Sequence, residues 1–242
     1  MRGILITFEG IDGCGKSTIV AEIARRIPGE VRPPFRGREF LFTAEPTDGQ
    51  EGRLLRERLK LPRAVGGGSG SADSDGLDEL EDLFLFLADH ARHLRERVVP
   101  ALARGAVVIS DRYSDSRAAY QGAALRTAVP RPREWVRDLH RPWSVPPDKT
   151  ILFSIDPALA FERCRSRIEE GRSTPQPPGP DKFEEETFLR EVAANFEAMA
   201  REEPGRFVVI DAGRDRSEVL EDAMRALAVA LAEAEAEAES GQ

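Results

Sequence analysis

The chain has 242 residues, with 43 acidic and 35 basic side chains and a formal net charge of −8 at pH 7. This acidic balance argues against a protein that coats nucleic acid or an anionic membrane, because such a protein needs a net basic face. A hydrophobic share of 40% and a charged share of 32% are typical of a globular domain and exclude a disordered polyanion.

Short apolar runs recur along the chain, and segments with helical periodicity separate them. The runs lie at 4–10, 39–44, 106–111, 150–156 and 206–211. The helical segments lie at 17–27, 51–60, 78–104, 116–125, 157–170 and 183–202, with a last helix from about 215. Consecutive apolar positions are typical of strands covered on both faces, and strand–helix alternation favours a parallel sheet. We therefore predict an α/β fold of three layers, with helices flanking a five-stranded parallel sheet.

Two stretches interrupt this pattern without separating two complete cores. Residues 62–76 are rich in Gly, Ser and Asp, which is typical of a flexible surface insert. Residues 173–182 contain too much Pro and Gly for a helix or a strand. We predict one domain over 1–228 and a fraying, acidic helical tail over 229–242.

The cysteines and the hydropathy pattern indicate the cellular compartment. Cys14 and Cys164 lie far apart and form no Cys-x-x-Cys motif. A zinc cluster or a disulfide framework is therefore not expected, and a reducing cytoplasm is favoured. No apolar run approaches the roughly 18 residues of a membrane span. We expect a cytoplasmic protein that works on small molecules.

The most specific motif is GIDGCGKS at 10–17, which matches the phosphate-binding pattern G-x-x-x-x-G-K-[ST]. An apolar strand precedes it and a helical segment follows, so backbone N–H groups at a helix start can face phosphates. Lys16 can reach the terminal phosphates, and the Ser17 hydroxyl can ligate Mg²⁺. A glycine-rich turn without a ligand is the alternative. The predicted ATP-binding residues are Gly10, Ile11, Asp12, Gly13, Cys14, Gly15, Lys16, Ser17 and Thr18.

A second polar site follows the apolar run at 106–111. Asp111 ends this run, as does the magnesium-assisting carboxylate of many phosphate-transfer enzymes, so the predicted metal residues are Ser17 and Asp111. Arg112 would then lie at the mouth of the sheet, where an arginine favours phosphate binding. A surface ion pair between Asp111 and Arg112 is the alternative. No N-K-x-D motif is present, which argues against a GTPase switch.

Together these segments resemble the thymidylate kinases, P-loop nucleoside-monophosphate kinases that phosphorylate dTMP with ATP and Mg²⁺. The resemblance covers about residues 3–212 and rests on an ordered set of segments. These are FEGIDGCGKST at 8–18, TAEPT at 43–47, LFLFLADHARHL at 83–94, DRYSDSRAAYQG at 111–122, DPALAFERCRSR at 156–167 and KFEEETFLREVAANF at 182–196. It implies the P-loop NTPase fold, a lid at about 169–182 and a homodimer.

The resemblance also implies roles for single residues on the acceptor side. Asp12 would contact the sugar–phosphate end of dTMP, and Arg112 would lie between the donor and acceptor phosphates. Arg56 would hold the dTMP phosphate. The residues implied around the base are Pro46, Phe86, His90, Tyr120 and Gln121, with Phe86 stacked on the thymine. Read from the residues alone, Phe86 fits a core position, Arg56 an exposed helix arginine and Asp12 a helix cap.

The lid is the third implied part of the site. Gly13 follows Asp12, so the phosphate loop offers no arginine, which resembles the members of the family that supply arginines from the lid. Arg163, Arg165, Arg167 and Arg172 cluster before the Pro-rich stretch. We select Arg163, Arg167 and Arg172 as catalytic candidates together with Lys16, Asp12, Asp111 and Arg112. A solvated basic helix face is the alternative.

Three departures from the family pattern concern the base. Ala44 replaces a usual arginine, His90 replaces the usual arginine that hydrogen-bonds the thymine, and Arg117 occupies a position that is more often small and polar. One alternative is therefore a kinase for another pyrimidine monophosphate or a deoxynucleoside. The other is a non-catalytic, ATP-dependent switch.

Overall fold

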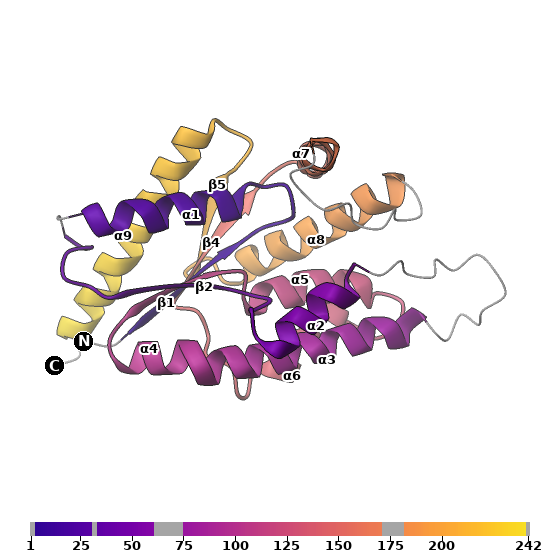
Figure 1. Cartoon of the computed structure of the whole chain (residues 1–242), viewed down its shortest axis with the longest axis horizontal. Helices are drawn as coiled ribbons and strands as arrows, with labels where there is room; N and C mark the ends of the chain where they lie inside the picture. The colour runs from indigo at the N-terminus through magenta and orange to yellow at the C-terminus, as the bar shows by residue number, and fades with distance from the viewer. Residues whose placement is uncertain (1–2, 31–32, 61–74, 171–181, 241–242) are drawn as a thin grey trace.

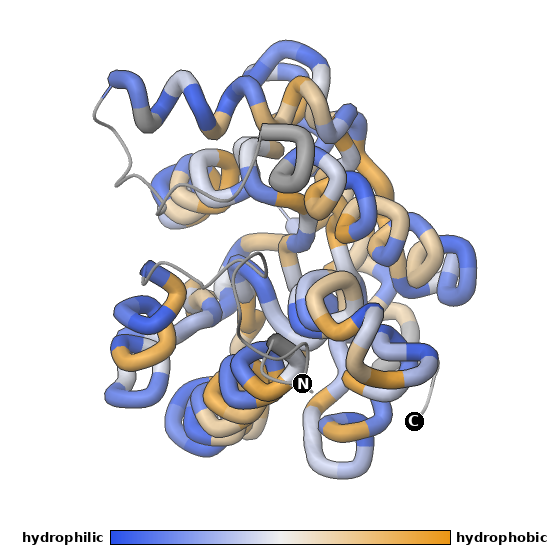
Figure 2. Tube along the Cα trace, turned by 90° about the vertical axis from the view of Figure 1, so that its right-hand side faces the viewer, coloured by the Kyte–Doolittle hydropathy of each residue, from blue (hydrophilic) through white to orange (hydrophobic). Residues whose placement is uncertain are grey.

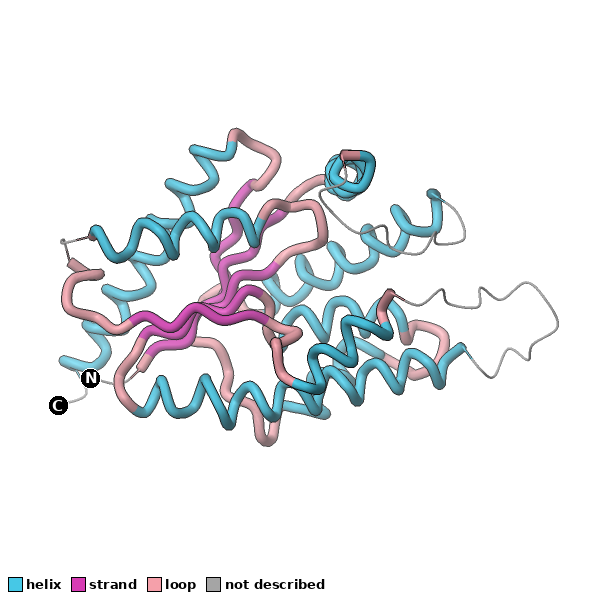
Figure 3. Tube along the Cα trace, viewed as in Figure 1, coloured by secondary structure: helices cyan, strands magenta, loops and turns pink. Residues whose placement is uncertain are grey.

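A parallel sheet forms the centre of the molecule. The computed structural model describes residues 3–30, 33–60, 75–170 and 182–240. The strands are β1 (Ile4–Glu9), β2 (Phe40–Ala44), β3 (Val107–Asp111), β4 (Lys149–Ser154) and β5 (Phe207–Asp211). They lie side by side in the order β2-β3-β1-β4-β5, and each neighbouring pair is parallel (Figure 3). The predicted five-stranded parallel sheet is confirmed.

Helices cover both faces of this sheet (Figure 1). They are α1 (Lys16–Arg26), α2 (Gln50–Arg58), α3 (Asp75–His93), α4 (Val99–Ala103), α5 (Ser114–Ala124), α6 (Pro132–His140), α7 (Pro157–Glu169), α8 (Lys182–Glu202) and α9 (Arg216–Ser240). A 3₁₀ turn, η1 (Ile27–Gly29), follows α1, and a π turn, η2 (Leu94–Val98), joins α3 to α4. In the part of the chain that the structure describes, no helix has the length and apolar character to cross a membrane.

Two helical predictions need correction. The predicted helix over 78–104 is α3, η2 and α4 in succession, because the π turn shifts the hydrogen-bond phase and Pro100 has no N–H to donate. Helix α6 lies where no helix was predicted. It is only nine residues long, but Pro132 occupies its first turn and Val136 packs against Leu83 and Leu125 in a small buried cluster.

Alternate side chains of β1 point to opposite faces of the sheet and pack against the helices on each face. Ile6 and Phe8 belong to the larger core cluster with Ile23 of α1, whereas Leu5 belongs to a second cluster with Val98 of η2. Every residue of β1 is buried, which accounts for its mostly apolar sequence, with Thr7 and Glu9 as its polar members. Hydrophobic and hydrophilic residues alternate along the helices, as expected of helices with one face on the core (Figure 2).

The parallel register brings the polar strand ends to one edge of the sheet. Phe8 of β1 pairs with Asp111 of β3, and Ala44 of β2 pairs with the same Asp111. The phosphate loop, the segment after β2 and the Asp111–Arg112 pair therefore meet at the carboxyl edge, where α/β folds bind ligands. Residues 62–74 of the insert predicted over 62–76 and 171–181 of the predicted lid, including Arg172, lie outside the described residues, and Asp75 and Gly76 begin α3. Helix α9 continues to Ser240, with Ala230 and Leu231 buried.

Candidate active site

The phosphate loop connects β1 to α1 in a conformation that glycine alone adopts easily. Gly13 has φ +83°, and a Cβ at this position would lie 2.1 Å from the backbone oxygen of Ala160 in α7. The loop therefore packs directly on the first turn of α7, whose amides at Ala158 and Leu159 donate to the Asp156 carboxylate at 2.8 and 3.2 Å. Helix α1 has no side-chain cap, so Asp12 does not cap it.

Lys16 lies at the start of α1 and is buried, with 4% of its side chain exposed. Its Nζ donates to Asp111 Oδ1 at the end of β3. This pair joins two of the predicted site residues across the sheet edge. The exposed Ser17 hydroxyl follows Lys16 directly. A hydroxyl and a carboxylate are hard oxygen donors of the kind that Mg²⁺ prefers, so the side-chain chemistry of Ser17 and Asp111 fits the predicted metal.

Arg112 connects the phosphate loop to α5. Its NH1 group donates to the Gly10 carbonyl at 3.1 Å and to Ser116 Oγ at 2.9 Å. Its NH2 group donates to Asp12 Oδ1 at 2.6 Å and to the Tyr120 hydroxyl at 3.2 Å. The guanidinium carbon also lies 4.9 Å from the centre of the Tyr120 ring. These contacts do not support the alternative, in which Arg112 and Asp111 form an ion pair on the surface.

The backbone of Arg112 is unusual as well. Its φ is +68°, a left-handed conformation that is uncommon for residues other than glycine and costs of order 1–3 kcal/mol. Two hydrogen bonds hold it there. The Arg112 amide donates to the Phe8 carbonyl at 3.0 Å, and Ser110 Oγ donates to the Arg112 carbonyl at 2.7 Å. Strained residues persist where the surroundings fix them, and such positions cluster at functional sites.

Tyr120 contacts both the phosphate loop and Arg112. Its hydroxyl accepts the Asp12 amide N–H at 2.9 Å, so Tyr120 contacts both Asp12 and Arg112. Its ring packs edge-on against Phe188 and Phe196 of α8. Burial, opposed by attraction to Arg112, raises the pKa of Tyr120 well above its ordinary value, so its hydroxyl keeps its proton. The predicted residues Asp12, Arg112 and Tyr120 therefore form one contact network.

Arg56 and Pro46 are brought together on the β2 side of the edge. Arg56 NH1 donates to the Pro46 carbonyl and Arg56 NH2 to the Thr47 carbonyl, each at 2.6 Å. The loop is tied to α3 because Thr47 donates through its amide and its hydroxyl to Asp89, at 2.7 and 2.5 Å. Arg56 also donates to Asp48 at 2.8 Å. Arg56 is therefore not a free helix arginine, and its contacts place it beside the segment implied to hold dTMP.

His90 lies in a buried polar cluster that the sequence did not indicate. Its Nδ1 and that of His93 each lie 2.7 Å from Glu45 Oε1, and Arg117 NH1 donates to Glu45 Oε2. His90 Nε2 lies 2.8 Å from Ser144 Oγ, so both ring nitrogens have partners. Burial, reinforced by repulsion from Arg117, lowers the pKa of His90.

The charge in this cluster rests on Glu45 and Arg117. Burial alone raises the pKa of the Glu45 carboxyl. Attraction to His90 and Arg117, together with the histidine hydrogen bonds, outweighs burial and holds that pKa well below its ordinary value. Glu45, His90 and His93 offer three metal-ligating atoms close together. A divalent cation there would be buried beside the positive Arg117, whereas the hydrogen bonds already satisfy the three side chains.

Arg117 and Gln121 carry buried polar atoms with no hydrogen-bond partner among the described residues. These atoms are Nε and NH2 of Arg117 and Oε1 of Gln121. The two residues are one helical turn apart on α5, so their side chains lie on the same side of the helix. Phe86 is half-buried on α3, one turn before His90. The structure places Phe86 and His90 on α3 and Arg117 and Gln121 on α5.

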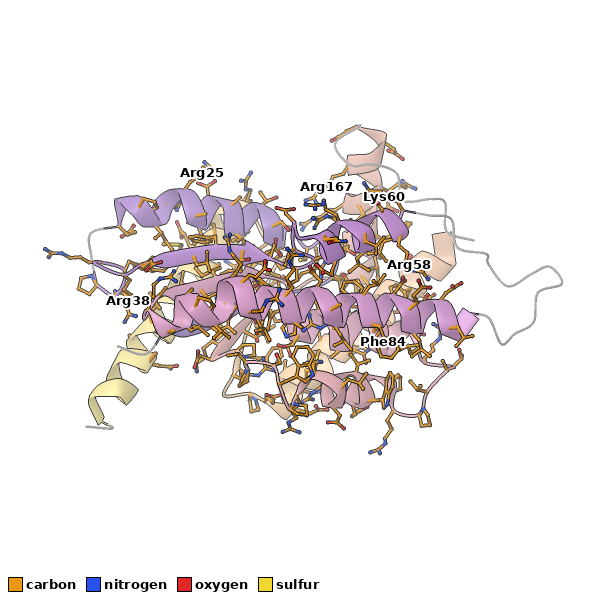
Figure 4. The ribbon with its side chains drawn as sticks, turned by 60° about the horizontal axis from the view of Figure 1, so that its bottom comes forward. Arg25, Arg38, Arg58, Lys60, Phe84 and Arg167 are labelled. Carbon is orange, nitrogen blue, oxygen red and sulfur yellow. The ribbon has the colours of Figure 1, made fainter. Side chains whose placement is uncertain are left out.

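The described lid arginines differ in their contacts. Arg163 NH1 donates to the Ala212 carbonyl at 3.0 Å, and Arg165 pairs with Glu162 at 2.9 Å. Arg167, at the end of α7, is half-buried and extends from that helix toward the side of α2 on which Lys60 lies (Figure 4). Of these side chains Arg163 is therefore held by the body of the fold, through the Ala212 carbonyl that follows β5.

Sequence reasoning missed two groups of residues around these candidates. Glu9 is fully buried at the end of β1, where Oε1 accepts the Tyr113 amide at 2.9 Å and Oε2 accepts the Ser116 hydroxyl at 2.5 Å. The signal was present, because a charged residue ends an otherwise apolar strand directly before Gly10. Glu45 carried a similar signal before Pro46, but its partners lie on α3 and α5.

Comparisons with known proteins agree with this geometry. A family model described as "Thymidylate kinase" matches residues 8–223. A protein of Methanosarcina mazei called "Probable thymidylate kinase" is 47% identical over 219 residues, which cover 90% of this chain and 92% of the relative. A "Probable thymidylate kinase" of Halobacterium salinarum is 43% identical over 225 residues, or 93% of this chain and 96% of the relative. On the family match and these relatives together, the chain belongs to the thymidylate kinase family.

Proposed function

We propose that this chain transfers the γ-phosphoryl group of ATP to dTMP and so forms dTDP and ADP. One observation carries the proposal most directly. Arg112 contacts the phosphate loop through Gly10 and Asp12, and it contacts α5 through Ser116 and Tyr120. A cation in this position faces the donor site and the acceptor site together, as a phosphoryl-transfer enzyme requires and a simple ATP-binding switch does not.

The donor side uses Lys16 and the loop amides. Lys16 contacts the β- and γ-phosphates after exchanging its Asp111 partner for phosphate oxygens, and the amides from Gly13 to Thr18 hold the same phosphates at the start of α1. Ser17 and Asp111 hold Mg²⁺. When bound, the ion neutralises charge on the phosphate oxygens during transfer.

Transfer needs positioning and charge stabilisation rather than a covalent enzyme intermediate. Arg112 stabilises the migrating phosphoryl group, and Asp12 orients Arg112 and the sugar–phosphate end of dTMP. Arg163, Arg167 and Arg172 form the arginine set of the lid, with Arg167 at the end of α7 on the side of Lys60 in Figure 4. Arginines on a closing lid add charge only when both substrates are bound, which limits hydrolysis of ATP by water.

The acceptor site lies between α3 and α5. Arg56 binds the dTMP phosphate beside Pro46, and Phe86 stacks on the thymine. Gln121 Oε1 accepts the N3–H of the base, and the Arg117 donors line the carbonyl edge, while His90 supports Arg117 through their shared partner Glu45. The unpartnered atoms of Arg117 and Gln121 support this assignment, because a donor and an acceptor one turn apart complement the alternating edge of a thymine or uracil.

Three further properties belong to the same proposal. The domain spans 1–228 with a lid at about 169–182 and an insert at about 62–76, and Ala230 and Leu231 at the start of the predicted tail also pack in its core. The enzyme works in the cytoplasm on small molecules and forms a homodimer. The exposed apolar side chains Leu77 and Phe84 on α3 are available for that contact (Figure 4).

A coupled assay with a panel of acceptors tests the proposal. ADP release is measured with ATP, Mg²⁺ and dTMP, dUMP, dCMP, UMP or thymidine. We expect the highest kcat/KM with dTMP. Since dTMP and dUMP differ by one methyl group, worth about 1–3 kcal/mol, we expect a dUMP rate lower by about 10- to 200-fold. Preference for another acceptor would identify a different nucleotide kinase, and ATP binding without acceptor-dependent ADP release would identify a switch.

A further inference from the structure

Glu9 is a fully buried carboxylate to which the proposed function assigns no contact with a substrate. It ends β1, directly before the phosphate loop. Oε1 accepts the Tyr113 amide at 2.9 Å, and Oε2 accepts the Ser116 hydroxyl at 2.5 Å. Both partners follow Arg112 within four residues, although Glu9 and Ser116 are 107 residues apart. A carboxylate buried without a binding role needs another explanation.

The direction of the hydrogen bonds between Arg112, Ser116 and Glu9 explains why a carboxylate is buried here. Arginine has donors only, so Arg112 NH1, 2.9 Å from Ser116 Oγ, must donate to that oxygen. A serine hydroxyl has a single proton, and this proton then points to Glu9 Oε2. The bonds run in one direction from Arg112 to Ser116 to Glu9. Such a chain requires an acceptor at its end, which an ionised carboxylate provides.

The second oxygen of Glu9 holds the backbone at the same place. The Tyr113 amide that Oε1 accepts belongs to the peptide that follows Arg112, whose φ is +68°. The Arg112 amide donates to the Phe8 carbonyl on the residue before Glu9. The end of β1 thus fixes the peptide on each side of Arg112, and Glu9 fixes its guanidinium through Ser116.

We propose that Glu9 is a positioning residue for phosphoryl transfer, which orients the guanidinium of Arg112 through the hydroxyl of Ser116 and fixes its backbone through the amide of Tyr113. The inference rests on the proposed function, since the orientation of Arg112 matters for the rate only if Arg112 contacts the transferred group. We call Glu9 a positioning residue rather than a catalytic one, because its described hydrogen bonds go to Tyr113 and Ser116 and it acts through Arg112.

Three charged side chains that face Glu9 influence the pKa of its carboxyl group. Asp115 faces it from α5, Arg112 from the β3–α5 connection and Lys16 from α1. Burial, with repulsion from Asp115, raises the pKa of Glu9 to about 7, against the Ser116 hydrogen bond and the two cations. Protonation turns one Glu9 oxygen into an O–H donor that faces another donor, either the Ser116 hydroxyl or the Tyr113 N–H, so one of its two acceptor contacts is lost. We therefore expect kcat to fall as the pH decreases through about 7.

A double-mutant cycle tests the relay. Glu9→Gln keeps the shape of the side chain but replaces one acceptor with a donor, and Ser116→Ala removes the hydroxyl. Each change is expected to lower kcat by about 10- to 100-fold, with a smaller change in KM, because Arg112 is displaced rather than removed. The double variant should be no slower than the slower single variant, since both changes break one chain. Multiplicative losses, or a Ser116→Ala variant with normal kcat, would overturn the proposal.

The pH profile separates positioning from general stability. Glu9→Gln should lose the decline of kcat that the unmodified protein shows below about pH 7. Asp115→Asn is the matched control on the same helix: it removes the repulsion that raises the Glu9 pKa, so the decline should move to lower pH. A decline that stays in place in both variants would contradict the role of Glu9.

Two control measurements, thermal unfolding of each variant and the activity of the unmodified protein, decide which proposal a negative result contradicts. Thermal unfolding of each variant shows whether it is folded, and if Glu9→Gln is not, Ser116→Ala and Asp115→Asn decide the question. Unmodified protein without dTMP-dependent ADP release would contradict the proposed function. Unmodified protein with that activity, combined with multiplicative losses in the cycle, would contradict only the role of Glu9.

Discussion

The NH2 group of Arg112 donates to Asp12 Oδ1 at 2.6 Å, and this contact joins the connection after β3 to the interior of the phosphate loop. The two residues are 100 positions apart in the chain. Asp12 is about half exposed and Arg112 is largely covered, so the pair lies at the border between the protein interior and the edge that receives nucleotides. Under the proposed function, a phosphoryl group that contacts Arg112 would compete with Asp12, so we expect the pair to couple substrate binding to catalysis.

The first prediction concerns the guanidinium of Arg112. Arg112→Lys keeps the charge but cannot reach Gly10, Asp12, Ser116 and Tyr120 together, because an ammonium lacks the planar fork. We expect kcat to fall about 10²- to 10³-fold in the coupled assay, the usual loss when one charge-stabilising donor is removed. Arg131→Lys is the matched control, since Arg131 also has a positive φ but is exposed. Equal effects of the two substitutions would contradict the role of Arg112.

The second prediction concerns the stability of the Glu45 cluster. Glu45→Gln removes the only carboxylate that the described contacts of Arg117 and the two histidines share. The buried Arg117 charge is then uncompensated, so we expect the free energy of unfolding to fall by about 3–5 kcal/mol in urea denaturation. Glu39→Gln is a suitable control, because Glu39 pairs with Arg104 at an exposed position. A loss below 1 kcal/mol for Glu45→Gln would contradict this account.

The third prediction concerns the pH dependence of stability. Burial, with repulsion from Arg117 and His90, lowers the pKa of His140 from 6.5 to about 3. Between these values the unfolded chain binds a proton that the folded chain does not, so the stabilisation present above pH 6.5 is lost as the pH falls toward 3. The loss from this residue approaches about 1.4 kcal/mol per pH unit. His140→Gln should show a correspondingly shallower slope in unfolding measured from pH 4.5 to 7, and an unchanged slope would contradict the assignment.

The fourth prediction concerns recognition of the base. Gln121→Leu removes the Oε1 acceptor while keeping much of the volume, and an unpaired N–H of the substrate costs about 1–3 kcal/mol. We expect KM for dTMP to rise by about 5- to 150-fold while KM for ATP stays within twofold. Both constants come from the same coupled assay. Equal increases in the two KM values would place Gln121 outside the base site.

Local patterns predicted the parts of this molecule that depend on neighbouring residues. The apolar run of β1, the glycines of the phosphate loop and the start of α1 are all contiguous, so their conformation and role follow from spacing. Asp111 and Arg112 were also predicted, because they end a strand whose neighbours share a parallel edge. Helix α6 was missed since nine residues between Pro-rich segments carry too few periodic positions.

Contacts between distant segments could not be predicted in this way. Glu9 meets Ser116 only because β1 and β3 are adjacent in the sheet, and Glu45 meets Arg117 only because the segment after β2 packs beside α5. His90 illustrates the same limit. The resemblance to the family implied that His90 contacts the base, whereas both of its ring nitrogens have protein partners in the structure.

The most direct test of the central claim follows the phosphoryl group itself. The protein is incubated with Mg²⁺, dTMP and ATP labelled with ³²P at the γ-position, and the products are separated by chromatography, with Arg112→Lys in parallel. We predict that the label appears in dTDP in equal amount to the ADP formed, and that Arg112→Lys slows its appearance about 10²- to 10³-fold. Label released as inorganic phosphate, or label that enters dTDP at the same rate in Arg112→Lys, would contradict the account.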